Sequence, residues 1–267
     1  MPHILWGKHF LFVTNIIRLR FRDYTLRFQY LKGFISQSKR YLSMDTAYLR
    51  RRIEHLIHTD SSVFAKRIRS EGSSCMRCGW CCTENFKIRI SEKIFRPSNA
   101  VSVFPGDIRR IIKKTGMEWH EVAEPDRYSC ILCGNTVWAI GWILRRDEAQ
   151  NCAFYSNNKC TIYMCRPVIC RCYPFFTDER CGVDIMHCEK GNEELTENCA
   201  AEIGLVLKRY EIKKLQSYIR IIKQMGEKLK LSNLHQLPEN YSGKVFVCDG
   251  ETVSSCRIDN GRFTRKY

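Results

Sequence analysis

The sequence has no unbroken apolar run long enough to span a membrane. Its apolar segments at 4–6 and 10–13 are separated by Lys8 and His9, and arginines follow closely at positions 18, 20 and 22. No small-residue cleavage site follows, so this region fits neither a signal peptide nor a spanning helix. We therefore expect a cytoplasmic protein without a transmembrane segment.

Internal repeats, low-complexity tracts and a nucleotide-binding glycine loop are also missing. No G-x-G-x-x-G motif follows a predicted strand, which argues against a dinucleotide-binding unit. The chain has 267 residues and is 44% hydrophobic, enough to bury a sizeable core. A folded protein is expected, with one domain or two.

Cysteine, in contrast, is abundant, and its distribution decides between disulfides and metal. Fourteen of the sixteen cysteines lie between Cys75 and Cys199. Without a secretion signal, a disulfide framework is disfavoured. Adjacent Cys81 and Cys82 also argue against simple pairwise bridges, because neighbouring side chains point apart. The distribution favours metal binding in a reducing compartment.

Eight cysteines form the predicted metal site. The first group has the pattern C-x2-C-x2-C-C, and its first three members have the spacing with which a loop wraps an iron–sulfur cluster. A ferredoxin-type run would place its fourth cysteine four residues on, before a proline, whereas here it follows at once. A downstream group supplies further thiols, which suffice for two four-thiolate sites. The predicted ligands are Cys75, Cys78, Cys81, Cys82, Cys152, Cys160, Cys170 and Cys188.

The number of thiolates alone does not separate zinc from iron–sulfur. The C-x2-C-G pairs at 75–78 and 130–133 have the shape of zinc knuckles and would together make one zinc site. The compact run at 75–82 fits cluster wrapping better, which favours an iron–sulfur cluster of the 4Fe–4S type over zinc. Arg166 and Arg171 are expected to offset the thiolate charge.

The net charge of +16 is concentrated in the flanks. Lys and Arg number 14 against 5 Asp and Glu over residues 1–74, 17 against 16 over 75–199, and 13 against 7 over 200–267. Basic flanks suit contact with an acidic protein partner or substrate, a nucleic acid or a membrane surface, or form solvated helix faces. A structural zinc domain whose basic helices bind a protein or nucleic acid is therefore an alternative function.

Apolar periodicity predicts an α+β fold: a small cysteine-rich metal-binding domain with few short strands, flanked by N-terminal helices and by a long C-terminal helix plus hairpin. The expected parts are a basic helical region (1–72), the cysteine-cluster domain (73–199), and an amphipathic helix with a hairpin (200–267). Translation starts at Met1 or at Met44.

Local signals refine this prediction. A helix follows Asp45 and Thr46, and Asp107 is expected to cap another helix that ends at Thr115–Gly116. Residues 136–144 are apolar enough for one buried strand.

Together, these patterns resemble the YkgJ-type cysteine-cluster family, described as a zinc- or iron-chelating CxxCxxCC domain. The match comprises the run at 75–82, C-A-F-Y from Cys152, C-T-I-Y-M-C-R-P from Cys160 and C-R-C-Y-P-F from Cys170, closed by Cys188. It covers roughly residues 73–192 and implies metal chelation by the eight cysteines named above.

The same resemblance extends to flagellin lysine N-methylases, which makes a lysine N-methyltransferase-like activity a third hypothesis, although no methyl-donor site is found. The chain departs from the family pattern through additional cysteines, which leave a third metal centre open. These are Cys130, Cys133, Cys165, Cys172, Cys181 and Cys199.

Overall fold

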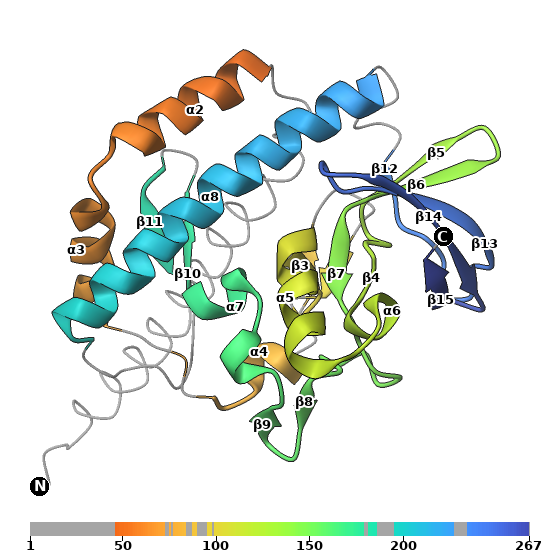
Figure 1. Cartoon of the computed structure of the whole chain (residues 1–267), viewed down its shortest axis with the longest axis horizontal. Helices are drawn as coiled ribbons and strands as arrows, with labels where there is room; N and C mark the ends of the chain where they lie inside the picture. The colour runs from red at the N-terminus through yellow and green to blue at the C-terminus, as the bar shows by residue number, and fades with distance from the viewer. Residues whose placement is uncertain are drawn as a thin grey trace, which may run out of the picture.

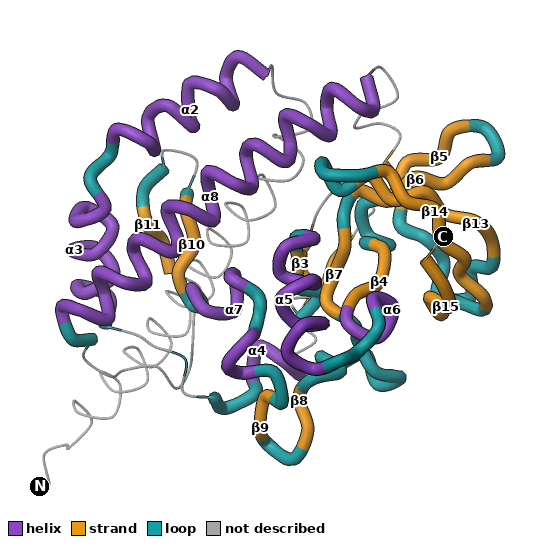
Figure 2. The backbone as a smooth tube through the Cα atoms, in the orientation of Figure 1, coloured by secondary structure: helices purple, strands orange, loops and turns teal. Residues whose placement is uncertain are grey.

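The computed structural model describes residues 46–72, 75, 77–83, 87–89, 95–97, 99–178, 181–185, 195–226 and 234–266. The helices at 46–58, 61–71 and 197–225 lie on one side of the molecule and the largest sheet on the other (Figures 1 and 2). The predicted α+β fold, with short strands, a long C-terminal helix and a final hairpin, is confirmed. The helices expected before residue 46, and the choice between Met1 and Met44, lie outside the described residues.

The described helices are α2 (Thr46–His58), α3 (Ser61–Glu71), α4 (Trp80–Thr83), α5 (Pro105–Thr115), α6 (Trp119–Val122), the 3-10 turn η1 (Tyr163–Cys165), α7 (Val168–Cys172) and α8 (Glu197–Met225). The strands are β1 (Lys87–Arg89), β2 (Phe95–Pro97), β3 (Ser102–Val103), β4 (Ala123–Pro125), β5 (Cys130–Cys133), β6 (Thr136–Ile140), β7 (Trp142–Leu144), β8 (Tyr155–Ser156), β9 (Lys159–Cys160), β10 (Phe175–Thr177), β11 (Val183–Ile185), β12 (Leu234–His235), β13 (Gly243–Cys248), β14 (Val253–Asp259) and β15 (Arg262–Lys266).

The helical side is built around α8, which has 29 residues and is therefore roughly 43 Å long. Thr196 caps its start by accepting from the amide of Cys199, and the helix stops before Gly226, as its apolar spacing predicts. Helices α2 and α3 pack on α8 through a core that includes Phe64 and Leu207. Gly204 lets α3 approach closely, because an added Cβ would lie 3.0 Å from the Ala65 amide nitrogen.

A buried ion pair strengthens this helical layer. Arg52 of α2 lies 3.6 Å from a carboxylate oxygen of Glu211 on α8, and Lys214 lies 2.5 Å from the other oxygen. The Arg52 and Glu211 side chains are 6% and 1% exposed, so each needs the other to offset the free energy of burying a charge.

The largest sheet has the strand order β12-β5-β6-β13-β14-β15. Its β6–β13 pair is parallel and joins the cysteine-rich region to the C-terminal hairpin. The predicted hairpin is confirmed as β13–β14, and its register pairs Cys248 with Val253 and Cys256 with Val245. The two hairpin cysteines therefore do not face each other across the strands; both are buried free thiols.

Two local expectations require correction. The apolar segment 136–144 forms two strands, β6 and β7, because Gly141 has φ +84° and turns the chain out of the first sheet. Strand β7 then lies between β3 and β4 in a separate sheet. Asp107 does not precede its helix: α5 starts at Pro105, so Asp107 occupies the first turn and accepts from the Phe104 amide at 3.4 Å.

None of the helices in the described part of the chain combines the length and apolarity needed to cross a bilayer.

Candidate metal centre

The first cysteine group wraps around Gly79 and the one-turn helix α4. Gly79 adopts φ +77°, which glycine tolerates far better than other residues, and its carbonyl accepts from the amides of Cys82 and Thr83 at 2.9 and 3.0 Å. This tight turn places adjacent Cys81 and Cys82 on α4, directly after Cys78. The C-x2-C-G spacing thus specifies a sharp reversal that brings four thiols into one short loop.

Tyr155 of β8 covers this turn. Its hydroxyl donates to the carbonyl of Cys78 at 3.2 Å, and its ring lies so close to Gly79 that an added Cβ would stand 1.9 Å from the ring. Burial, followed by the nearby Cys82, Cys78 and Cys81 thiols, raises the pKa of the Tyr155 phenol. The side chain was not selected from the sequence, although it ends the C-A-F-Y segment that the resemblance highlights.

The second group meets the first through the backbone. The amide of Cys152 donates to the carbonyl of Cys82 at 2.9 Å, which joins segments 70 residues apart in the chain. Cys160 lies opposite Tyr155 in the β8–β9 hairpin, so the hairpin presents a thiol and an aromatic ring to α4 together. Figure 1 shows α4, α7 and the β8–β9 hairpin gathered at the same end of the molecule.

Cys170 comes from the short helix α7, whose start is fixed by Asp107. One carboxylate oxygen of Asp107 accepts from the amide of Val168 at 3.2 Å and from Arg110 at 2.7 Å. Asp107 is only 3% exposed, so these bonds form away from bulk water. The carboxylate therefore positions the helix that carries Cys170, a function that the spacing of the cysteines does not reveal.

Seven of the eight predicted ligands are described, and they form one neighbourhood. Cys82 influences the ionisation of Cys152, Cys160 and Cys170 electrostatically, and Cys75 influences Cys81 and Cys160. We call this set the thiol cluster: Cys75, Cys78, Cys81, Cys82, Cys152, Cys160 and Cys170. Cys188, the eighth predicted ligand, lies outside the described residues.

The thiol cluster is not arranged as a closed ligand cage. Among the described residues, no group of three or more His, Cys, Asp or Glu side chains has a geometry that could hold a metal ion. The chemistry of the donors nevertheless suits soft metals, because thiolates are the preferred ligands of zinc and of iron–sulfur clusters. The assignment of individual ligands stays a prediction.

The thiols lie in surroundings that oppose free thiolates. Burial, assisted by nearby thiols, raises the pKa of Cys152 to about 12 and the pKa of Cys170 well above its ordinary value. Burial likewise raises the pKa of Cys160. A hydrogen bond between adjacent thiols lowers the pKa of Cys82 and raises that of Cys81. A bound cation is the kind of charge that would hold such groups as thiolates.

Arg166 contributes positive charge at the thiol cluster. It lowers the pKa of both Cys160 and Cys170, opposing the effect of burial. Its guanidinium donates to the carbonyls of Cys170 at 3.3 Å and Tyr163 at 2.9 Å, which anchors it there. Arg171 points elsewhere: it lies 3.8 Å from Glu202 of α8. The expected charge compensation therefore falls mainly to Arg166.

The predicted zinc knuckle at 130–133 is wrong. Strand β5 contains Cys130 and Cys133, and residues three apart in a strand face opposite sides of the sheet. Cys130 is buried in the core, where its thiol donates to the carbonyl of Asp126 at 3.4 Å, whereas Cys133 is exposed. The pair cannot present two sulfurs to one metal, either alone or together with Cys75 and Cys78.

The other additional cysteines also have structural positions. Cys165, Cys172 and Cys181 are buried in the two main cores, where small apolar thiols pack well. Cys199 is exposed in the first turn of α8. The described residues therefore offer no third metal centre among these cysteines.

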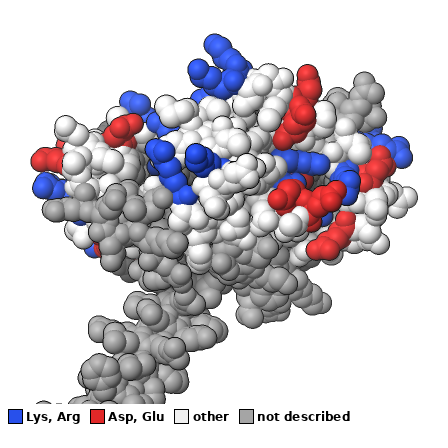
Figure 3. All heavy atoms as spheres, turned by 90° about the horizontal axis from the view of Figure 1, so that it is seen from below, with Lys and Arg blue, Asp and Glu red and all other residues white. Residues whose placement is uncertain are grey.

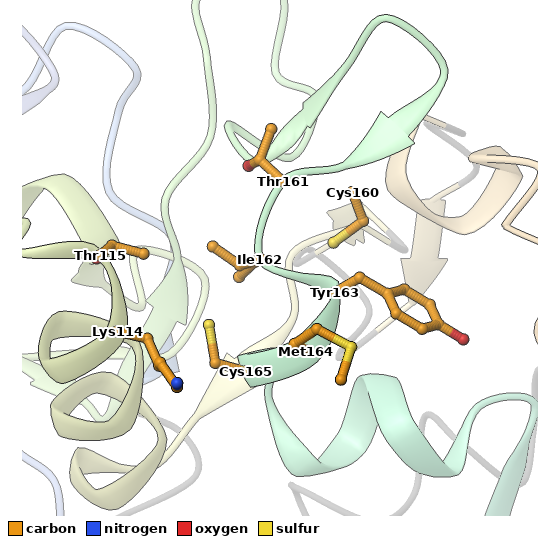
Figure 4. A pocket seen from close by; sticks show the side chains of 8 residues that line it. All are labelled: Lys114, Thr115, Cys160, Thr161, Ile162, Tyr163, Met164 and Cys165. Carbon is orange, nitrogen blue, oxygen red and sulfur yellow. The ribbon is translucent and has the colours of Figure 1, made fainter.

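A shallow pocket of about 350 Å³ lies beside the thiol cluster. Figure 4 shows that it lies between the end of α5, with Lys114, and the segment 160–165, with Met164. Cys160 and Cys165 both line it. The pocket therefore connects a predicted metal ligand with the surface.

Comparison with known proteins supports the metal assignment. Residues 74–200 match the family model described as "CxxCxxCC: Putative zinc- or iron-chelating domain". The expected resemblance is thereby confirmed for this part of the chain, and metal binding with it; the description does not separate zinc from iron. No curated protein and no solved structure matches the chain.

Proposed function

We propose that the thiol cluster, completed by Cys188, holds an iron–sulfur cluster and that the protein transfers electrons to or from a protein partner. The observation that carries this proposal is the compact run at 75–82, whose first three cysteines have the spacing that wraps an iron–sulfur cluster, together with its contact to the second cysteine group. The Cys152 amide bonds to the Cys82 carbonyl at 2.9 Å, and the Tyr155 hydroxyl bonds to the Cys78 carbonyl at 3.2 Å. Seven thiols exceed the four that either one zinc ion or one 4Fe–4S cluster needs, so their number leaves room for a second centre.

Particular side chains would serve such a centre. Four of these eight thiols, the thiol cluster and Cys188, would supply the ligands of one 4Fe–4S cluster, and the cluster would supply one-electron redox chemistry. Tyr155 shields the Cys78–Gly79 turn from water, and Arg166 provides positive charge beside Cys160 and Cys170. Shielding and nearby charge are the means by which proteins adjust the reduction potential of such centres.

Structural zinc remains the competing proposal, but in a narrower form. The knuckle pair that favoured zinc is split between opposite faces of β5–β6, so zinc would have to take four ligands from the thiol cluster itself. Methyl transfer has less support, because the sequence contains no glycine loop of the kind that binds a nucleotide-like donor. Redox activity is therefore preferred.

The location proposed for this activity is the cytoplasm. All fifteen described cysteines are free thiols. Free thiols at this density are typical of a reducing compartment, in which iron–sulfur ligands also stay reduced.

Metal analysis of protein purified without oxygen tests the proposal. Iron and acid-labile sulfide in equal amounts, near four of each per chain for one 4Fe–4S cluster, are expected. Zinc near one or two per chain, without iron or sulfide, would replace the redox proposal by a structural one. Purification of the Cys160→Ser variant in parallel shows whether the bound metal depends on the thiol cluster.

A further inference from the structure

An exposed apolar residue stands next to the thiol cluster. Met164 is 91% exposed, more than any other large apolar side chain in the described part of the chain. It lies in η1, between Cys160 and Cys170, and lines the pocket in Figure 4. Its side chain is therefore open to contact by another molecule.

Cations lie beside Tyr163, the residue that precedes Met164. The guanidinium carbons of Arg77 and Arg166 lie 4.0 and 3.7 Å from the ring centroid of neighbouring Tyr163, and Lys114 lines the same pocket as Met164. We call these five residues the Tyr163 surface. Figure 3 views the molecule from below and shows Lys and Arg side chains both near the middle and at the edges of this face.

Within the described ranges, no carboxylate forms an ion pair with Arg77, Lys114 or Arg166. Arg166 also faces the thiols of Cys160 and Cys170, so Arg77 and Lys114 carry most of the charge that this surface offers to a partner. The nearby Arg110 is different, because it pairs with buried Asp107 at 2.7 Å and also donates to the carbonyl of Arg166 at 2.9 Å.

The composition fits a protein better than a nucleic acid. Protein interfaces combine an apolar centre with a polar rim and are enriched in Met, Tyr and Arg. Nucleic-acid platforms need free aromatic faces on which bases stack. Two guanidinium groups already lie over the Tyr163 ring, which leaves little of its face for a base.

We propose that the Tyr163 surface docks an acidic protein, whose carboxylates meet Arg77, Lys114 and Arg166 while an apolar side chain of that protein contacts Met164. The docking itself does not depend on which metal the chain holds. The role of this partner as electron donor or acceptor rests on the proposed function, since docking here would bring it within a few residues of Cys160 and Cys170.

Two synthetic peptides and one oligonucleotide separate the effect of charge, the effect of the apolar contact and binding of a nucleic acid. The first peptide has six Glu-Leu repeats, the second has six Glu-Ser repeats, and a single-stranded oligothymidylate carries the same charge. Titration calorimetry with the full chain, in the metal state in which it is isolated, measures binding at low and at moderate salt. We expect the Glu-Leu peptide to bind most tightly, with an affinity that falls as salt screens the cations.

Matched variants locate the binding. The double variant Arg77→Gln/Lys114→Gln should lower the affinity for the Glu-Leu peptide about threefold to tenfold at low salt, the size expected for the loss of two exposed charge pairs. Arg50→Gln/Arg51→Gln removes the same charge from exposed positions on α2 and should have little effect. Met164→Ala changes an exposed side chain and leaves the core intact. It should lower the affinity for the Glu-Leu peptide to that for the Glu-Ser peptide.

Three results would overturn the inference. Equal losses in the two double variants would show a response to net charge alone. Equal affinities for the two peptides would show that no apolar contact with Met164 contributes to binding. Tighter binding of the oligonucleotide, lost in Lys114→Gln alone, would make the surface a nucleic-acid site. Iron and sulfide analysis of the same samples reports separately on the proposed function, so the two proposals can fail independently.

Discussion

Substitution of Gly79 by alanine tests how the first cysteine group is built. Gly79 has φ +77°, and a Cβ at this position would stand 1.9 Å from the Tyr155 ring. Gly134 is a matched control: it also follows the second cysteine of a C-x2-C pair, it has φ +59°, and a Cβ there would meet nothing within 4 Å. Gly134→Ala therefore carries only the backbone cost.

The loss of stability in Gly79→Ala has two parts, backbone strain and overpacking against Tyr155, which can be estimated separately. A residue with a Cβ in the left-handed region costs roughly 1–2 kcal/mol, which is the expected loss for Gly134→Ala. Gly79→Ala bears the same cost plus about 1–3 kcal/mol for overpacking against Tyr155. Because the Tyr155 hydroxyl bonds to the carbonyl of Cys78, displacing the ring should also open the thiol cluster to water.

Urea unfolding of Gly79→Ala, Tyr155→Ala and the double variant measures the coupling between the two positions. Once the ring is absent, alanine at 79 should cost only the backbone term, so the cycle should show a coupling of about 1–3 kcal/mol. Transfer of metal to a competing chelator should be faster in Gly79→Ala than in Gly134→Ala. Equal stability losses in the two glycine variants, with no coupling in the cycle, would refute this account of the turn.

Three further changes address the ligands and their support. Cys160→Ser should lower the metal content measured after anaerobic purification. Cys133→Ser, at an exposed position on β5, should leave the metal content unchanged. Equal losses of metal would contradict the assignment of Cys160, and not Cys133, to the thiol cluster. Asp107→Ala removes a carboxylate that accepts from the Val168 amide and from Arg110, and should lower the free energy of unfolding in urea by about 1–3 kcal/mol. Asp107→Asn should have an intermediate effect. Unchanged stability would show that Asp107 does not stabilise α7. Glu211→Leu removes the buried carboxylate that Arg52 and Lys214 face and should cost about 3–5 kcal/mol. A smaller loss than in an exposed Glu202→Leu control would contradict the importance of this carboxylate.

Long, strongly periodic elements could be predicted from the sequence. Helix α8 repeats apolar residues over eight turns between a threonine cap and Gly226, and the hairpin β13–β14 alternates along both strands. Short elements were harder to place. The end of β6 depends on the positive φ of Gly141, and the start of α5 on Pro105, each a single-residue effect that periodicity does not register.

The ligand set stays a prediction, but part of its setting follows from the sequence. The compact spacing at 75–82 predicts four thiols in one short loop, because a metal site needs particular residues at short intervals. The same spacing misled at 130–133, since a C-x2-C-G segment suits a knuckle and a strand followed by a turn equally well. The bond of Tyr155 to Cys78 and the bond of Asp107 to Val168 were not predicted, because they join residues 77 and 61 positions apart.

Spectroscopy of the chain purified without oxygen tests the central claim most directly. Reduction with dithionite should bleach a broad brown visible absorption and produce a paramagnetic signal from a reduced iron–sulfur cluster, while Cys160→Ser should lose much of both. A colourless chain that contains zinc and gives no signal before or after reduction would contradict the proposed redox centre and leave the thiol cluster with a structural role.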